Sequence, residues 1–248
     1  MALKGILFDK DNTLVDLAAF YREPVRRTVA YLLDRCGYSG NEMLTARLNR
    51  AAGFCDDLLL PESPVVAGTN WDTIDACARE LTAAGIQMDG NFREEGAQYL
   101  ERACLQYGTV VGTTDLTALL STLKGAGLYL GVATSDHYAS IMHCLRKLEI
   151  DAYFDLVLAA DRVTAAKPAP EMAQAFCRAC DIVPEEVAMV GDSDNDMLFA
   201  KNSGMHGILY RSQPLPQKLP LGAICAISDL KQLPELLDQW QGRQKPLS

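Results

Sequence analysis

The sequence predicts an α/β protein with a doubly wound parallel sheet and an all-helical domain inserted after the first strand. Three observations predict this fold class. A short apolar run at residues 6–8 ends abruptly in an acid, apolar residues then recur at helical spacing across residues 18–108, and strands alternate with helices from Thr113 onwards. Such alternation is typical of a parallel sheet with helices on both faces. The first strand must join that sheet, so the helical block is an insertion.

Length, composition and charge narrow the class of protein. The 248 residues, 49% of them hydrophobic, fit one large domain that carries an insertion. We expect the core at residues 1–16 and 113–248, and the helical domain at residues 17–112. The formal net charge of −9 disfavours nucleic acid and anionic membranes as partners, but it permits a small anionic substrate in a local positive pocket. No sequence feature predicts an oligomeric state.

Location and redox state follow from what the sequence lacks. No window approaches about 18 uninterrupted apolar residues, so no membrane span is expected. The first residues contain no signal-peptide h-region, which predicts a cytoplasmic location. The eight cysteines are scattered among apolar neighbours and are expected to be reduced. Cys177 and Cys180 form a C-x-x-C within a helical stretch, without a second pair, and we interpret them as helix packing.

The first strand is predicted at residues 4–8. Asp9 and Asp11 then lie on the loop at its carboxyl end, which is the edge of an open α/β sheet where ligands bind. Two carboxylates this close share a proton, bind a cation or point apart into water. Taken alone, the pair also fits a solvated acidic turn.

Four helices and no strand are predicted in the insertion. The third helix begins near Thr69 or Asn70, both good N-cap residues, and is expected to bury Trp71. A proline-bearing loop at residues 53–68 precedes it. The four helices are expected near residues 18–36, 43–51, 70–81 and 92–107.

The second part of the core alternates strands and helices. Its short apolar runs are bounded by glycines and polar turn residues, as strands of a parallel sheet usually are. The expected strands are residues 128–133, 156–160, 187–190, 207–209 and 223–227, and the expected helices are residues 115–124, 138–148, 171–180, 195–203 and 230–240.

Acids and hydroxyls follow three of the predicted strands. Besides Asp9, the second motif is Thr134-Ser135-Asp136, and the third is the acid-rich run at residues 191–196. The carboxyl ends of parallel strands share one edge, so these groups are expected to converge. Four of the carboxylates would form a cluster too negative to stand alone, and Mg²⁺ prefers such oxygen ligands. The four are Asp9, Asp11, Asp192 and Asp196.

Lys167 supplies positive charge at the same edge. It follows a predicted strand and precedes a helix that starts with proline. By itself it would be interpreted as an exposed lysine before a helix. The acids on the same edge favour a functional role instead.

The four motifs, in this order, resemble those of the haloacid-dehalogenase-like (HAD) superfamily of phosphatases. The resemblance covers the whole chain, and the helical insertion is similar to the family's small helical cap, on a Rossmann-like core. Asn12 stands where many members have glycine, and asparagine tolerates left-handed turn conformations better than most residues. The motifs are Asp9-Lys10-Asp11-Asn12-Thr13, Thr134-Ser135, Lys167-Pro168 and Gly191-Asp192-Ser193-Asp194-Asn195-Asp196.

The resemblance implies roles for the acids. Asp9 would attack phosphorus and form an aspartyl-phosphate, while Asp11 would protonate the leaving oxygen and later activate water. Mg²⁺ would bind the Asp9 carboxylate, the Asp11 backbone carbonyl and Asp192. Asp196 would orient this metal site without binding the ion directly.

The resemblance also implies a phosphate site. Thr134 and the Ser135 backbone amide would hold phosphoryl oxygens, and Lys167 would stabilise the charge on the transferring group. The helical cap would exclude water when it closes over the site. The expected substrate is a small phosphorylated metabolite, with phosphoglycolate as the leading guess.

Three other functions stay open. A 2-haloacid dehalogenase on the same fold needs neither metal nor second acid, so Asp11 and the pair of Asp192 and Asp196 argue against it. A phosphomutase differs only in where the phosphoryl group goes next. A phospho-acceptor signalling module also gathers acids, a hydroxyl and a lysine at a sheet edge, but this chain is about twice as long as such a module.

Overall fold

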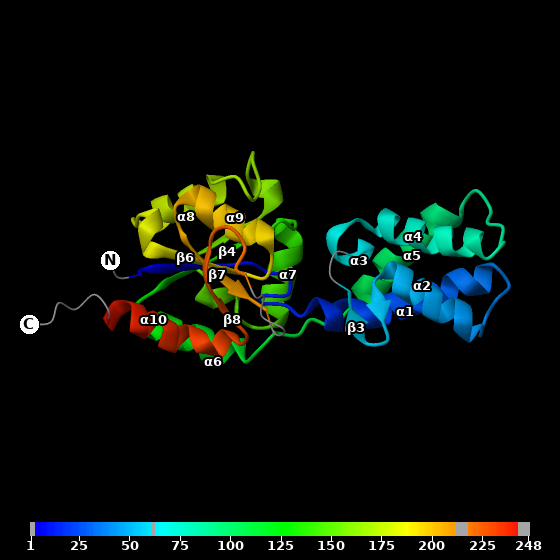
Figure 1. Ribbon diagram of the computed structural model, residues 1–248, viewed down its shortest axis with the longest axis horizontal. Helices are drawn as coiled ribbons and strands as arrows, with labels where there is room; N and C mark the ends of the chain where they lie inside the picture. The colour runs from blue at the N-terminus through cyan, green and yellow to red at the C-terminus, as the bar shows by residue number, and fades with distance from the viewer. Residues whose placement is uncertain (1–2, 61–62, 212–217, 243–248) are drawn as a thin grey trace, which may run out of the picture. The chain divides into compact units, whose positions relative to one another are not determined.

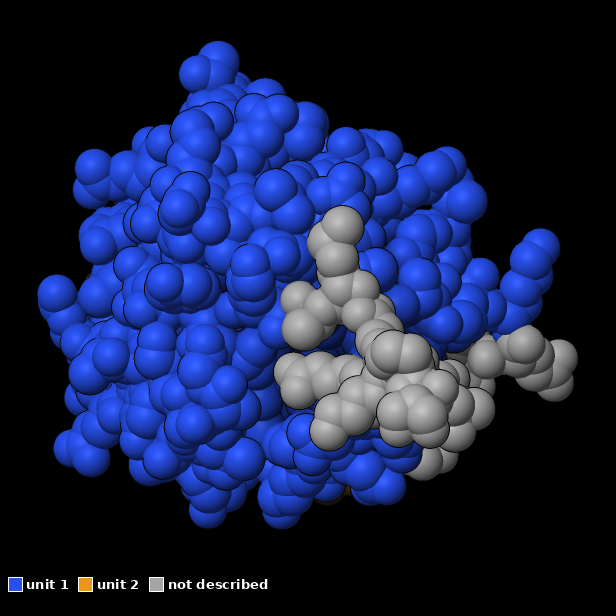
Figure 2. All heavy atoms as spheres, turned by 90° about the vertical axis from the view of Figure 1, so that its left-hand side faces the viewer, with its two compact units in different colours: residues 1–16, 112–248 blue, residues 17–111 orange. Residues whose placement is uncertain are grey.

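A computed structural model of the chain describes residues 3–60, 63–211 and 218–242. The chain divides into two compact units, and each has its own core. The first is an α/β unit of Met1–Asp16 and Gly112–Ser248, and the second is a helical unit of Leu17–Val111. Figure 2 shows one face of the α/β unit in blue. Within the described residues, no helix is long and apolar enough to cross a membrane.

The α/β unit is built on a parallel sheet, as predicted, with six strands among the described residues. The strand order is β5-β4-β1-β6-β7-β8, so the first strand of the chain is central. The strands are β1 (Gly5–Phe8), β4 (Tyr129–Ala133), β5 (Leu156–Leu158), β6 (Val187–Gly191), β7 (His206–Tyr210) and β8 (Ala223–Ile227).

Strand β1 is an uninterrupted apolar segment because both of its faces are covered. All four of its residues are buried. Its last residue, Phe8, pairs in register with Val132 of β4 and with Val190 of β6. The three central strands therefore end at the same level, and the residues that follow them emerge at one edge.

Helices cover both faces of the sheet (Figure 1). Helices α8 and α9 lie on one face, and α6 and α10 lie on the other. The face beneath α8 and α9 carries a core that includes Leu7, Phe176 and Phe199. The helices are α6 (Leu116–Gly125), α7 (Tyr138–Lys147), α8 (Glu171–Cys180), α9 (Asp194–Ser203) and α10 (Leu233–Gly242), with short 3-10 turns at Asp151–Tyr153, Ala160–Arg162, Pro184–Glu186 and Leu230–Gln232.

The helical unit differs from the sequence prediction in three places, one of which is the short helix α3 (Pro64–Ala67) inside the expected proline-bearing loop. A two-stranded antiparallel hairpin lies between α2 and α3, where no strand was expected. Trp71 was expected to be buried but is 46% exposed, because it stands at the start of α4, ahead of the buried positions Ile74, Cys77 and Leu81. The elements are α1 (Leu17–Arg35), α2 (Glu42–Ala52), β2 (Phe54–Cys55), β3 (Leu58–Leu59), α3 (Pro64–Ala67), α4 (Asn70–Ala83) and α5 (Phe92–Tyr107).

The cysteines form no disulfide. Cys177 and Cys180 are buried within α8 and contribute to the core of the α/β unit. Their placement agrees with the interpretation as helix packing.

Candidate active site

The loop after β1 is a tight turn that begins with Asp9. The Asp9 amide donates to the Val190 carbonyl at 2.8 Å, which extends the pairing with β6 by one residue. The amides of Leu14 and Val15 both donate to the Lys10 carbonyl at 2.9 Å. Asn12 adopts the left-handed conformation that this turn requires, with φ of 54°. The turn keeps Asp9, which is only 7% exposed, inside the sheet edge.

The loop after β6 brings two more carboxylates to the same edge. Asp192 directly follows the strand, and Ser193 caps α9. Asp196 occupies the third position of the helix and completes a capping box, because its carboxylate accepts from the Ser193 amide at 3.2 Å. The same carboxylate also accepts from the Ser193 hydroxyl at 2.6 Å. A Cβ atom at Gly191 would lie 2.4 Å from the Asp196 carboxyl carbon, so only glycine permits this approach.

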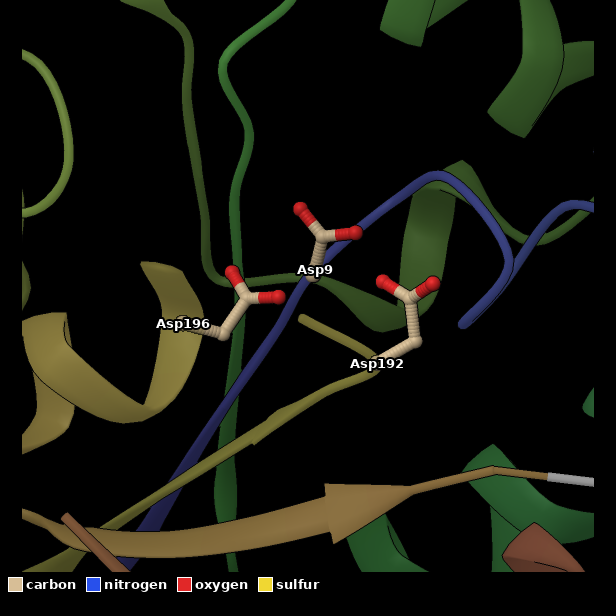
Figure 3. A group of neighbouring side chains, drawn as sticks. All are labelled: Asp9, Asp192 and Asp196. Carbon is tan, nitrogen blue, oxygen red and sulfur yellow. The ribbon is translucent and has the colours of Figure 1, made fainter. Parts of the chain in front are cut away.

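The carboxylates of Asp9, Asp192 and Asp196 lie side by side and extend to the same side of the sheet edge (Figure 3). One oxygen from each lies within 4.8 Å of the others. Such a set of hard oxygen donors fits a divalent cation of the Mg²⁺ type. Asp196 is 1% exposed and its two oxygens already accept hydrogen bonds from Lys167 and Ser193. Asp9 and Asp192 are therefore better placed than Asp196 to bind an ion directly.

Lys167 is buried between two of these acids. Its Nζ donates at 2.6 Å to Asp9 Oδ1 and at 2.6 Å to Asp196 Oδ1, and the residue is 8% exposed. Burial acts to lower the pKa of Lys167, but the two carboxylates raise it above its usual value. The side chain therefore stays charged, although it is buried.

Asp9 and Asp192 hold protons more tightly than free aspartates do. Burial, together with the neighbouring charge of Asp196, raises the pKa of Asp192 to about 7. Burial also raises the pKa of Asp9 well above its usual value, although Lys167 opposes that shift. In the absence of a cation the cluster carries an excess of negative charge, and a bound cation would replace the protons that reduce it.

The loop after β4 carries the predicted phosphate-binding residues. Thr134 is 1% exposed, its amide donates to the Leu158 carbonyl at 3.0 Å, and its hydroxyl accepts from the Asp136 amide at 3.1 Å. Ser135, the next residue, is exposed. Thr134 and Ser135 thus follow a strand adjacent to β1, at the edge where Asp9 lies.

Three residues at this edge had no predicted role, namely Lys10, Asp136 and Arg211. Lys10 is 6% exposed, and its Nζ lies 2.9 Å from Asp11 Oδ1 and 2.5 Å from Asp136 Oδ2. Arg211 follows β7 and donates from Nε to the Asp192 carbonyl at 3.3 Å. The sequence did contain a signal for Lys10, because this lysine stands between two acids at the end of a predicted buried strand. Arg211 had no such signal, because only the strand order brings β7 beside β6.

Burial raises the pKa of Asp11, and Lys10 opposes this shift. Burial acts to raise the pKa of Asp136, but the charge of Lys10 lowers this pKa below its usual value. Burial acts to lower the pKa of Lys10, and Asp11 and Asp136 together raise it. The edge therefore contains two buried lysines, and each of them lies between two aspartates.

Comparison with known proteins places these residues within a family. Residues 3–204 match the family model described as haloacid dehalogenase-like hydrolase. The chain is 44% identical over 130 residues to a probable phosphatase, IndB, of Dickeya dadantii, and this alignment spans 52% of each chain. It is 27% identical over 210 residues to the phosphoglycolate phosphatase of Salmonella typhimurium, covering 82% of this chain and 79% of that one.

The solved structures show the same fold. A putative beta-phosphoglucomutase from Thermotoga maritima superposes with a TM-score of 0.68 at 21% identity, covering 96% of this chain and 99% of that one.

Proposed function

Because the chain belongs to the haloacid dehalogenase-like hydrolase family, we propose that it is a Mg²⁺-dependent phosphatase that hydrolyses a small phosphomonoester through an aspartyl-phosphate. The placement of Asp9 carries this proposal. Its carboxylate is buried at the end of the central strand, 2.6 Å from the Lys167 ammonium, with oxygens of Asp192 and Asp196 within 4.8 Å. The proposed nucleophile Asp9, the ammonium group of Lys167 and the carboxylates that would bind a metal ion thus lie close together.

The metal would be held by the carboxylates of Asp9 and Asp192 and by the backbone carbonyl of Asp11. When bound, it would supply positive charge to the nucleophile and to the transferring phosphoryl group. Asp196 would orient this arrangement without binding the ion directly, since its two oxygens accept hydrogen bonds from Lys167 and Ser193.

The reaction would proceed in two steps. Asp9 attacks phosphorus, the bond to the leaving oxygen breaks, and that oxygen takes a proton from the Asp11 carboxyl. Asp11, now a carboxylate, takes a proton from water as the water attacks the aspartyl-phosphate, which releases phosphate and restores Asp9. Lys167 would stabilise the phosphoryl oxygens during both transfers, together with the Thr134 hydroxyl and the Ser135 amide.

We propose phosphoglycolate as the first substrate to test. The support is the 27% identity to a phosphoglycolate phosphatase across 82% of this chain. The chain also matches a probable phosphatase over about half its length. This match supports the reaction class but does not identify the leaving group of the substrate.

Phosphate release tests the proposal. The purified protein is assayed with phosphoglycolate, other small phosphomonoesters and an aryl phosphate, with Mg²⁺ and with a chelator. We expect release that depends on Mg²⁺, and a strong preference for phosphoglycolate would identify the substrate. Phosphate transfer to a second position of a sugar phosphate would indicate a phosphomutase. A single long-lived phosphate per chain would indicate an acceptor module, and halide release from a 2-haloacid would indicate a dehalogenase.

A further inference from the structure

Lys10 connects two loops that the proposed reaction uses. It stands between Asp9 and Asp11 on the loop after β1, and its Nζ lies 2.5 Å from Asp136 Oδ2 on the loop after β4. The same Nζ lies 2.9 Å from Asp11 Oδ1. A lysine that is only 6% exposed and has two carboxylate partners is costly to bury. Such a cost suggests a role other than stability.

Asp136 is held firmly, so it can act as the fixed end of this connection. Its Oδ1 accepts from the His137 amide at 2.7 Å, and its carbonyl accepts from the Ala160 amide at 3.0 Å. Its own amide donates to the Thr134 hydroxyl at 3.1 Å. A shift of Asp136 would therefore also move Thr134.

Asp11, in contrast, has few constraints on its side chain. Among the described residues, the Lys10 ammonium is its one ion-pair partner, and its buried Oδ1 makes no hydrogen bond of good geometry. The contact with Lys10 is thus the main interaction that restricts the Asp11 carboxylate.

We propose that Lys10 is a positioning residue for proton transfer, which bridges Asp11 to Asp136 and thereby sets the Asp11 carboxyl at a fixed place relative to Thr134. The inference rests on the proposed function and deepens it. In the first step the bond between phosphorus and the leaving oxygen breaks, and the proton moves from Asp11 to that oxygen. Lys10 does not exchange a proton in this step and touches no substrate atom. It keeps Asp11 where the transfer can occur.

Leaving-group dependence separates this role from a general structural one. The value of kcat/KM reports the steps up to departure of the leaving group. An alkyl ester needs a proton from Asp11, whereas an aryl ester with an acidic phenol leaves without one. For Lys10→Met we expect kcat/KM to fall roughly a hundredfold with the alkyl ester and less than about threefold with the aryl ester. Lys10→Arg should recover part of the loss, because guanidinium can also bridge two carboxylates.

Two further variants complete the experiment. Lys124→Met is the matched control, because Lys124 forms an exposed ion pair with Asp155 at 2.8 Å in the same unit, and we expect both esters to be unaffected. In an Asp11→Asn background, Lys10→Met should cause little further loss with the alkyl ester, because the two residues act as one unit.

Crystal structures of the wild type and of Lys10→Met provide a readout that does not need activity. We expect the Asp11 carboxylate to leave its position in the variant. An unmoved Asp11, or equal losses with both esters in an active protein, would overturn the inference and leave the proposed function intact. A wild type that releases no phosphate from any ester would overturn both.

Discussion

Two buried lysines, each between two aspartates, set the electrostatics of this sheet edge. Lys167 lies between Asp9 and Asp196, and Lys10 lies between Asp11 and Asp136. Buried ion pairs often contribute little net stability, because desolvation of the charges offsets their attraction. The arrangement is therefore better explained by the need to hold carboxylates in place than by stability.

Replacement of Asp9 by asparagine tests its proposed role as nucleophile separately from its contribution to folding. The amide of Asp9→Asn can still accept from Lys167 but cannot form an aspartyl-phosphate. We expect phosphate release to fall below detection, while the melting temperature stays close to that of the wild type. Release assays and thermal melts followed by circular dichroism check both parts. Turnover at the wild-type rate would remove Asp9 as the nucleophile.

For Asp192, the pKa of about 7 predicts how stability depends on pH without metal. The unfolded chain releases this proton near the usual aspartate pKa, whereas the folded protein retains it until about pH 7. The folded state then binds more protons between these values, so this contribution to stability is present at low pH and is lost as the pH rises toward 7. Asp192→Asn cannot ionise and should remove this loss.

Thermal melts in chelator measure this effect. We expect Asp192→Asn to melt a few degrees above the wild type at about pH 8, with a clearly smaller difference at about pH 5. Asp194→Asn serves as the control, because Asp194 is an exposed neighbour with a side chain 80% accessible. The same difference at both pH values would contradict the assignment of a raised pKa to Asp192.

At the scale of single elements, the start of α9 links helix capping to the site. Ser193 accepts from the Asp196 amide at 3.2 Å, and its hydroxyl donates to the Asp196 carboxylate at 2.6 Å. One interaction therefore begins the helix and orients a member of the acidic cluster. An equivalent capping box, between Thr69 and Asp72, begins α4 in the helical unit.

Ser193→Ala is expected to affect both stability and metal dependence. Loss of the cap should lower the free energy of unfolding by about 1 kcal/mol, and a less restricted Asp196 should raise the Mg²⁺ concentration needed for half-maximal phosphate release. Thr69→Ala is the matched control, with a similar loss of stability and no change in Mg²⁺ dependence. Chemical denaturation and Mg²⁺ titration of activity measure the two effects. An unchanged Mg²⁺ requirement in Ser193→Ala would show that the cap has no influence on the cluster.

Most elements could be predicted because their patterns are long or sharply bounded. Helix α5 was expected at residues 92–107 and runs Phe92–Tyr107, since a full helical period repeats between Asn91 and Gly108. The hairpin of β2 and β3 was missed because strands of two residues show no alternation. Trp71 was wrongly predicted to be buried, because a position in the first turn of a helix does not by itself show whether the side chain faces the core.

The candidate site could be predicted only in part, for a similar reason. The rule that parallel strands end at one edge predicts that Asp9, Thr134 and Asp192 converge, and the structure has all three directly after neighbouring strands. The contact between Lys10 and Asp136 depends on side-chain directions across 126 positions of sequence, which no local pattern specifies. The roles of all these residues in catalysis stay predictions.

At the scale of the whole molecule, the helical unit is expected to fold alone. Among the described residues, the buried members of its core run from Val25 to Leu100 and include fully buried side chains from all four of its long helices. We therefore predict that a fragment of residues 17–111 is helical and unfolds cooperatively. Circular dichroism and thermal melting check this, and a fragment that melts without a transition and binds a hydrophobic dye would show that its core needs the rest of the chain.

The central position of β1 has a consequence for biosynthesis. This strand pairs with β4 and β6, which lie about 120 and about 180 residues later in the chain. During translation β1 leaves the ribosome long before either neighbour, and the helical unit emerges in between. The Val15–Gly112 bridge at the two ends of that unit brings the flanking segments together and shortens the loop that remains to be closed. Asp9, although synthesised early, meets Asp192 only after β6 has docked, so we expect the edge that carries the acidic cluster to be among the last parts of the protein to form.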